Sequence, residues 1–112
     1  MDHRKPGGVT IVRIWHGVTA ATKADEYLDY LRATGVPAYQ ETEGNRGVYV
    51  LRRVEGGRAH FLTVSFWESI EAIKGFAGSN PEKARYYPED GEFLLDFEPT
   101  VEHCEVLTGP GA

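Results

Sequence analysis

The sequence predicts an α+β fold, and three observations lead to it. Runs rich in Val, Ile and aromatic residues at 9–18, 47–55, 58–67 and 100–107 indicate four strands. Two segments with helical spacing of apolar residues separate the first strand from the second and the third from the fourth. A Gly56-Gly57 pair joins the two middle runs and predicts a tight hairpin. The order β-α-β-β-α-β is that of a ferredoxin-like antiparallel sheet with both helices on one face.

The first helix is expected to begin with Thr22 as its N-cap and to end at Gly35, with Pro37 just beyond it. Its apolar residues share one face: Ala24, Tyr27, Leu28 and Leu31. The segment 36–46 is then a connector with at most one turn of helix.

The second helix is expected to follow Ser69 as N-cap and to end at Gly78. Its apolar residues, Ile70, Ile73 and Phe76, again recur at helical spacing. Asn80-Pro81-Glu82 has the order cap, first position and acidic first turn, and it predicts one more short helix.

The chain has 112 residues and a net charge of −5, which suits one domain at 9–107 with tails at 1–8 and 108–112. The acidic balance argues against nucleic-acid binding, which needs a surplus of Lys and Arg. A single cysteine, Cys104, excludes an intrachain disulfide and is expected to be a packed thiol. No run is long and apolar enough for a membrane span, and no export signal is evident. We expect a cytoplasmic protein.

Both faces of the predicted sheet carry large apolar side chains. On the first strand Val12 and Ile14 oppose Ile11 and Trp15, and the third strand alternates in the same way. One face is covered by the helices, and the chain has no further element for the other. The sequence therefore predicts a homodimer with the two sheets face to face. A monomer with an unusually apolar sheet is the alternative.

Four segments in this order resemble the antibiotic biosynthesis monooxygenase superfamily. They are Ile11-Val-Arg-Ile-Trp-His-Gly17, Gly44-Asn-Arg-Gly-Val-Tyr-Val50, Thr63-Val-Ser-Phe-Trp-Glu-Ser69 and Ala84-Arg-Tyr-Tyr-Pro-Glu-Asp90. The resemblance covers residues 9–107, and its most specific part is Trp67-Glu68-Ser69 followed by a helix. It implies a dimeric α+β barrel with a pocket between the sheet and the helices of each protomer. Characterised members include cofactor-free oxygenases of polycyclic aromatics and haem-degrading oxygenases.

Two residues are candidate catalytic groups. The resemblance places Trp67 in the pocket wall, where an indole stacks on a flat substrate; a core tryptophan is the alternative. His16 ends the first strand, and a histidine can act as acid or base on a phenol; a structural histidine bonded to backbone is the alternative. We expect the first and third strands to be parallel neighbours, which would bring His16 and Trp15 close to Trp67. His60, at the other end of the third strand, is expected to belong to the hairpin.

Four more residues are candidate substrate-binding groups: Arg13, Trp15, Arg85 and Tyr86. Arg85 could hold an enolate or phenolate oxygen and Tyr86 could donate a hydrogen bond to it; a helix end with an aromatic plug is the alternative. Arg13 lies in the middle of a central strand, so it must pair or line a polar cavity. Glu102 or Glu105 on the neighbouring last strand could neutralise it, and an anion anchor in the pocket is the functional alternative.

The sequence predicts no bound metal and no cofactor. No histidine pair has metal-ligand spacing, and no flavin, nicotinamide or nucleotide motif is present. In the haem-degrading branch the iron ligand is a histidine on the side of the second helix, and residues 69–99 contain none. The leading hypothesis is a cofactor-independent monooxygenase of a small planar aromatic. A non-catalytic dimeric binding or stress-response protein of the same fold is the alternative.

Overall fold

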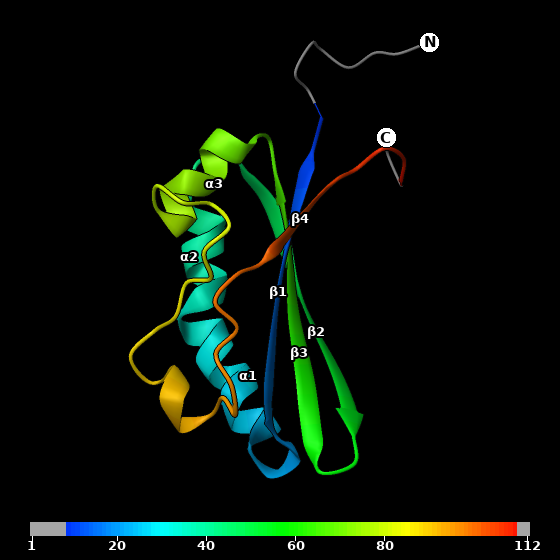
Figure 1. Cartoon of the computed structure of the whole chain (residues 1–112), viewed down its shortest axis with the longest axis vertical. Coiled ribbons are helices and arrows are strands. Elements are labelled where there is room, and N and C mark those ends of the chain that lie inside the picture. Colours follow the sequence, from blue (N-terminus) through cyan, green and yellow to red (C-terminus); the bar gives the residue numbers. More distant parts are fainter. Residues whose placement is uncertain (1–8, 110–112) are drawn as a thin grey trace.

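The computed structural model describes residues 9–109 and has the predicted α+β order. The elements are β1 (Ile11–Ala20), α1 (Ala24–Ala33), α2 (Gly35–Glu41), β2 (Asn45–Glu55), β3 (Arg58–Trp67), α3 (Ile70–Ala77) and β4 (Glu102–Glu105). The predicted tail at 1–8 lies outside the described residues, as does 110–112 of the other tail. Figure 1 shows the helices, together with the loop between α3 and β4, on one side of the sheet.

The four strands form one sheet in the order β2-β3-β1-β4, and every neighbouring pair is antiparallel. This confirms the ferredoxin-like fold. The expectation that β1 and β3 are parallel is wrong. The helical crossover makes β2 run parallel to β1, and the Gly56-Gly57 hairpin then reverses the chain, so β3 must oppose both. Trp67 therefore pairs with Ile11, and His16 pairs with Leu62, in the middle of β3.

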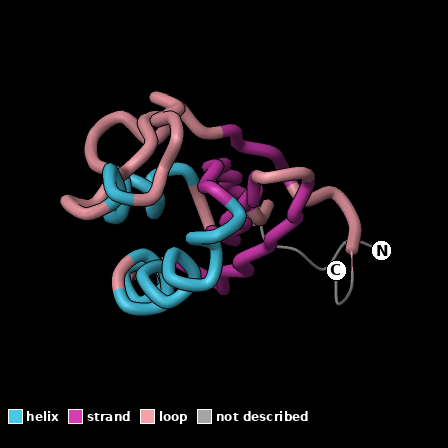
Figure 2. The backbone as a smooth tube through the Cα atoms, turned by 90° about the horizontal axis from the view of Figure 1, so that it is seen from below, coloured by secondary structure: helices cyan, strands magenta, loops and turns pink. Residues whose placement is uncertain are grey.

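The two faces of the sheet have different environments. Along β1 and β3 the side chains that face the helices are buried, and Phe61 and Trp67 are fully so. Two apolar clusters fill this layer, one around Trp15 and Phe61 and one around Trp67 and Phe76. Figure 2, seen from below, shows the helices on one side of the strands and no described helix on the other.

The second face carries apolar side chains that no described element covers. They lie on all three long strands: Val12, Ile14, Val18, Tyr49, Leu51, Leu62, Val64 and Phe66. Tyr49 is 64% exposed and Leu51 46%. We call this surface the open face. The thiol of Cys104, opposite Val12, is exposed there, so the expectation of a packed thiol is not met in the single chain.

The structure has a helix, α2, where the sequence predicted a connector after Gly35. α1 ends at Ala33, and the chain continues almost directly into α2, which contains Pro37. Pro37 is the third residue of α2, and a proline is tolerated in a first turn because the N–H groups there have no intrahelical partner. The helix predicted to follow Ser69 is α3. It begins after Ser69, whose hydroxyl accepts from the N–H of Ala72, and its C-cap is Gly78, as predicted.

Two local predictions are wrong. Thr22 makes no N-cap hydrogen bond and lies inside a 3₁₀ turn at Ala21–Lys23. Asn80-Pro81-Glu82 forms a turn instead of a helix, with the Asn80 side chain accepting from the Glu82 N–H. Lys83 directly afterwards pairs as an isolated bridge with Thr100, and this pairing straightens the backbone where a helix would have to continue.

Gly17 allows the Trp15 indole to lie flat along β1. A Cβ on Gly17 would meet Trp15 Cη2 at 2.3 Å and Leu94 Cδ2 at 3.1 Å. We predict that Gly17→Ala lowers the free energy of unfolding by about 1–3 kcal/mol, because a buried ring must leave its position. Urea denaturation measures the change. Gly57→Ala is the matched control, since a Cβ added at Gly57 would have nothing within 4 Å. Equal effects of the two changes would contradict the prediction.

Candidate functional site

A cavity of about 20 Å³ lies between the sheet and the helices. That is room for about one water molecule. Apolar walls come from β1, α1 and α3, but an unusual number of polar groups also converge: Arg13, Tyr39, Thr63, Arg85, Tyr87 and Asp90. We call this the helix-side cavity. An apolar cavity with a few convergent polar groups is the usual form of a small-molecule site.

Arg13 projects from β1 into this cavity and is only 1% exposed. Its Nη2 donates to the Lys83 carbonyl at 2.9 Å, and its Nη1 lies 3.4 Å from the Tyr39 hydroxyl. Its Nε is buried and has no partner among the described residues. The guanidinium also lies 5.2 Å from the Phe76 ring centroid.

No carboxylate neutralises Arg13 among residues 9–109, so the predicted pairing with Glu102 or Glu105 is wrong. Both glutamates lie on β4 and are exposed. The register explains this, because Arg13 pairs with His103 while Glu102 and Glu105 are opposite Ile14 and Ile11. Burial lowers the pKa of Arg13, and nearby Arg85 lowers it further. The direct contacts of this buried cation among the described residues are therefore neutral dipoles and a ring, with no ion pair.

Arg85 lies at the mouth of the cavity, where it is exposed to solvent. It donates to the Phe76 carbonyl at 3.0 Å, and its guanidinium lies 4.8 Å from the Phe76 ring and 5.0 Å from the Tyr87 ring. The Phe76 ring is thus in contact with both Arg13 and Arg85. Two guanidinium groups in one small cavity favour an anionic ligand.

Two tyrosine hydroxyls add neutral hydrogen-bond donors. The Tyr39 hydroxyl is 2.9 Å from the Thr63 hydroxyl, and the Tyr87 hydroxyl is buried without a partner among the described residues. Burial raises the pKa of both Tyr39 and Tyr87. Both phenols therefore stay protonated and can donate to a ligand oxygen.

Asp90 is the carboxylate of the cavity and is 2% exposed. It begins the 3₁₀ turn η2 (Asp90–Glu92). The Tyr27 hydroxyl donates to its Oδ1 at 3.2 Å, and the Tyr87 N–H donates to its Oδ2 at 2.6 Å. Burial raises the pKa of Asp90. Sequence reasoning missed this residue, because Asp90-Gly91 has the composition of an ordinary turn and nothing local distinguishes a buried aspartate from an exposed one.

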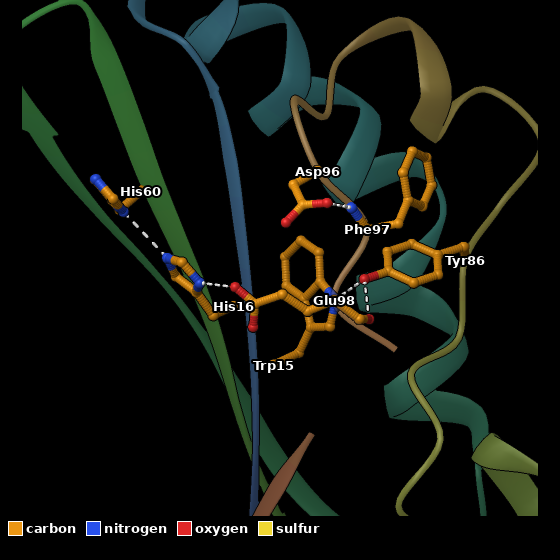
Figure 3. Close-up of polar contacts among 7 residues, drawn as sticks. All are labelled: Trp15, His16, His60, Tyr86, Asp96, Phe97 and Glu98. Carbon is orange, nitrogen blue, oxygen red and sulfur yellow. Dashed lines mark hydrogen bonds and ion pairs between the residues drawn. The ribbon is translucent and has the colours of Figure 1, made fainter. Parts of the chain in front are cut away.

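Trp15 lines the cavity, and Tyr86 contacts the Trp15 indole from outside the cavity. The indole N–H of Trp15 lies 3.4 Å from the Tyr86 hydroxyl, which donates to the Glu98 carbonyl at 2.6 Å (Figure 3). Tyr86 is not part of the cavity lining. Of the four predicted substrate-binding residues, the structure brings Arg13, Trp15 and Arg85 together, while Tyr86 lies one contact further out.

His16 lies on the open face, away from the cavity. Its Nδ1 contacts Glu98 Oε2 at 2.5 Å, and its Nε2 is 3.0 Å from His60 Nδ1 (Figure 3). The expectation that His16 and Trp15 lie beside Trp67 is wrong, because it assumed parallel strands. His60, assigned to the hairpin, is instead the partner of His16.

Trp67 is fully buried behind the cavity and does not line it. Its indole donates to the Ser65 hydroxyl at 2.9 Å, and its ring packs on Tyr39 and Phe76, which do line the cavity. The catalytic roles of His16 and Trp67 stay predictions. Trp67 acts on the cavity only through these two rings.

Within residues 9–109 no three metal-binding side chains of the types His, Cys, Asp and Glu cluster together. None of the helices in that part of the chain has the length and apolarity needed to cross a membrane. Arg52 and Arg53 form ion pairs with Asp25 and Glu55 at the surface.

Solved structures with the same architecture are known. A candidate antibiotic biosynthesis monooxygenase from Bacillus cereus is 20% identical, with a TM-score of 0.61 over 94% of this chain and 100% of that one. A haem-degrading protein from Mycobacterium tuberculosis is 22% identical, with a TM-score of 0.58 over 94% and 99%. This chain has the antibiotic biosynthesis monooxygenase fold. A Nitrosomonas europaea protein of unknown function is 13% identical, with a TM-score of 0.63 over 92% and 94%. No protein-family model and no curated protein sequence matches the chain.

From the raised pKa of Asp90 we predict how the free energy of unfolding depends on pH. The folded protein holds this proton more tightly than the unfolded chain does, so folding stability contributed by Asp90 falls as pH rises above about 4, the unfolded value. The free energy of unfolding of wild type, relative to that of Asp90→Asn, should therefore decrease from pH 4 towards neutrality. Urea titrations across this range test it. Asp96→Asn removes a carboxylate from an exposed position and is the control; a difference that rises with pH would contradict the prediction.

Proposed function

We propose that the protein is a monooxygenase that binds a small planar aromatic as its phenolate or enolate in the helix-side cavity. It oxygenates this anion with molecular oxygen and without a cofactor. The observation that carries the proposal is the buried guanidinium of Arg13, whose Nε is unpartnered and which has no carboxylate within 4 Å among the described residues. An uncompensated buried cation is costly, and an anionic ligand offsets that cost.

The charges of the cavity suit this reaction. A phenolate or enolate is electron-rich enough to transfer an electron to oxygen, which its neutral form is not. Arg13, Arg85 and the Tyr87 hydroxyl present donors to the oxygen that carries the negative charge, and fixed donors in a water-poor site stabilise such charge strongly. Trp15 and Phe76 supply flat apolar walls for the rings.

The reaction balances without an external reductant. An activated methylene group loses two hydrogens and gains one oxygen atom as a carbonyl, and the second oxygen atom leaves as water. All four electrons that reduce oxygen come from the substrate carbon.

A non-catalytic binding protein is the second candidate, and the size of the cavity favours it. About 20 Å³ does not hold an aromatic ring, so the walls must move for any such ligand to enter. Arg85 at the mouth is exposed, which makes it the first cavity residue that an incoming anion meets. In a pure binding protein the same residues would hold the anion without promoting its reaction with oxygen.

Haem does not fit the residues present. The fold is shared with a haem-degrading protein, but the cavity lining contains no histidine, cysteine or methionine. The segment 69–99, which covers α3 and the following loop, also lacks histidine. Haem chemistry is therefore not part of the proposed reaction.

A homodimer completes the proposal. Exposing the apolar side chains of the open face to water is unfavourable. A second copy packed sheet to sheet would cover them with the same residues from both protomers. The catalytic cavity lies on the other face and is built within one chain. A cytoplasmic location also stays part of the proposal.

Oxygen uptake tests the activity. With 1,8-dihydroxy-9-anthrone as substrate, metal-stripped wild type should consume oxygen well above the buffer rate, and Arg13→Met should lose about 100-fold, the loss typical of removing an anion-stabilising donor. Arg53→Met, which removes an exposed arginine, should keep the wild-type rate. A far-UV spectrum and a melting curve establish that Arg13→Met is folded. Equal rates for wild type and folded Arg13→Met would refute the role given to Arg13, and wild type at the buffer rate would favour the binding protein.

Sedimentation velocity tests the dimer. Wild type should sediment as a dimer, and Val64→Lys, which puts a charge in the middle of the open face, should sediment as a monomer. Ile70→Lys makes the same change at an exposed position on α3 and should stay dimeric. A monomeric wild type would contradict this part of the proposal.

A further inference from the structure

The proposed reaction needs a base, because a neutral phenol or anthrone must lose a proton before it reacts with oxygen. The sequence suggested His16 for this task. His16 lies on the open face, bonded to Glu98 and His60, and does not reach the helix-side cavity. The base must therefore be sought among the residues that line the cavity.

We propose that Asp90 is the general base that deprotonates the substrate in the helix-side cavity. This inference rests on the proposed function and adds a residue to it. Asp90 is the only carboxylate among the described lining residues. It is held from two sides, by the Tyr27 hydroxyl on Oδ1 and by the Tyr87 N–H on Oδ2, so its orientation is fixed before a substrate arrives.

The carboxylate keeps the capacity to accept a proton. Each of its oxygens accepts one hydrogen bond from the described residues and can accept a second. Burial favours the protonated form of Asp90. A carboxylate that binds a proton more readily than an exposed one is a better base near neutral pH.

Asp90 and the two arginines share the cavity without forming an ion pair. No contact of 4 Å or less joins Asp90 to Arg13 or Arg85 in the described part of the chain. Buried opposite charges normally neutralise each other. Here the positive groups remain free to hold a substrate oxygen and the negative group remains free to take a substrate proton, and deprotonation needs both at once.

The step is a simple proton transfer. The Asp90 carboxylate takes a proton from the activated methylene C–H, or from the O–H of its enol tautomer, and the electron pair of that bond stays on the substrate as an enolate. Arg13 and Arg85 face the new negative charge. After oxygen adds, the Asp90 carboxylic acid returns its proton to the departing oxygen atom, which leaves as water once it also takes the second hydrogen of the methylene.

A purely structural Asp90, which only holds the η2 turn against Tyr27, is the competing explanation. The two roles respond differently to pH. A base is unnecessary when the substrate is already ionised in solution, whereas a distorted cavity stays distorted at every pH.

The experiment compares oxygen uptake by wild type, Asp90→Asn and Asp96→Asn with 1,8-dihydroxy-9-anthrone from below to above the pH at which this compound ionises. Each rate is corrected for the buffer reaction at the same pH. At low pH, Asp90→Asn should be slower than wild type by about 100-fold, the usual contribution of a general base. The deficit should shrink towards zero as the substrate ionises, and Asp96→Asn should match wild type throughout.

Binding of 1,8-dihydroxyanthraquinone, followed by quenching of tryptophan fluorescence, gives an independent readout of an intact cavity. At a pH at which the phenols of this compound are protonated, Asp90→Asn should still bind it, because the cavity is intact. A deficit that is the same at every pH, or no deficit at low pH, overturns the role of Asp90 while wild-type activity upholds the proposed function. A wild type that is inactive at every pH overturns the proposed function, and with it this inference.

Discussion

The buried guanidinium of Arg13 is the interaction around which the site is organised. It lies in the middle of a central strand, and its Nη groups bond to the Lys83 carbonyl and the Tyr39 hydroxyl. These two contacts join the sheet to α2 and to the loop after α3, so the cation links three of the segments that surround the cavity. Among the described residues it has no carboxylate within 4 Å, and its charge is therefore available to a ligand.

The sheet separates two surfaces with different tasks. Residues that alternate along β1 send Arg13 and Trp15 to the helix-side cavity and Ile14 and His16 to the open face. A single-residue shift in register would exchange these sets. The covered face provides an enclosed polar cavity, and the open face provides the apolar area that a second copy needs. Function and assembly are thus built on opposite sides of the same four strands.

The sequence was sufficient for the fold because the apolar periodicity, the Ser69 cap and the Gly56-Gly57 turn agree, although the predicted caps at Thr22 and Asn80 are wrong. It was also sufficient to single out Arg13, because an arginine in a central strand must pair or line a polar cavity, and the family resemblance added Trp15 and Arg85, which line the same cavity. The sequence did not place His16 correctly, because its position relative to Trp67 depends on whether β1 and β3 are parallel or antiparallel. Asp90 could not be found, because its importance comes from burial under Tyr27 and Tyr87, which is a tertiary property. In the sequence, Pro37 indicated that the helical region had ended. It instead lies in the first turn of α2, a position that tolerates proline.

The central claim is that the helix-side cavity is an anion site created by Arg13. The most direct test is the affinity of 1,8-dihydroxyanthraquinone measured against pH, with its dimethyl ether as the neutral analogue. The account predicts that binding to wild type tightens by about 10- to 100-fold as the ligand ionises, the range expected for a charge-assisted hydrogen bond. Arg13→Met should lose this dependence. If the ether binds as tightly as the anion, and Arg13→Met binds both as wild type does, the cavity is not an anion site and the account is wrong.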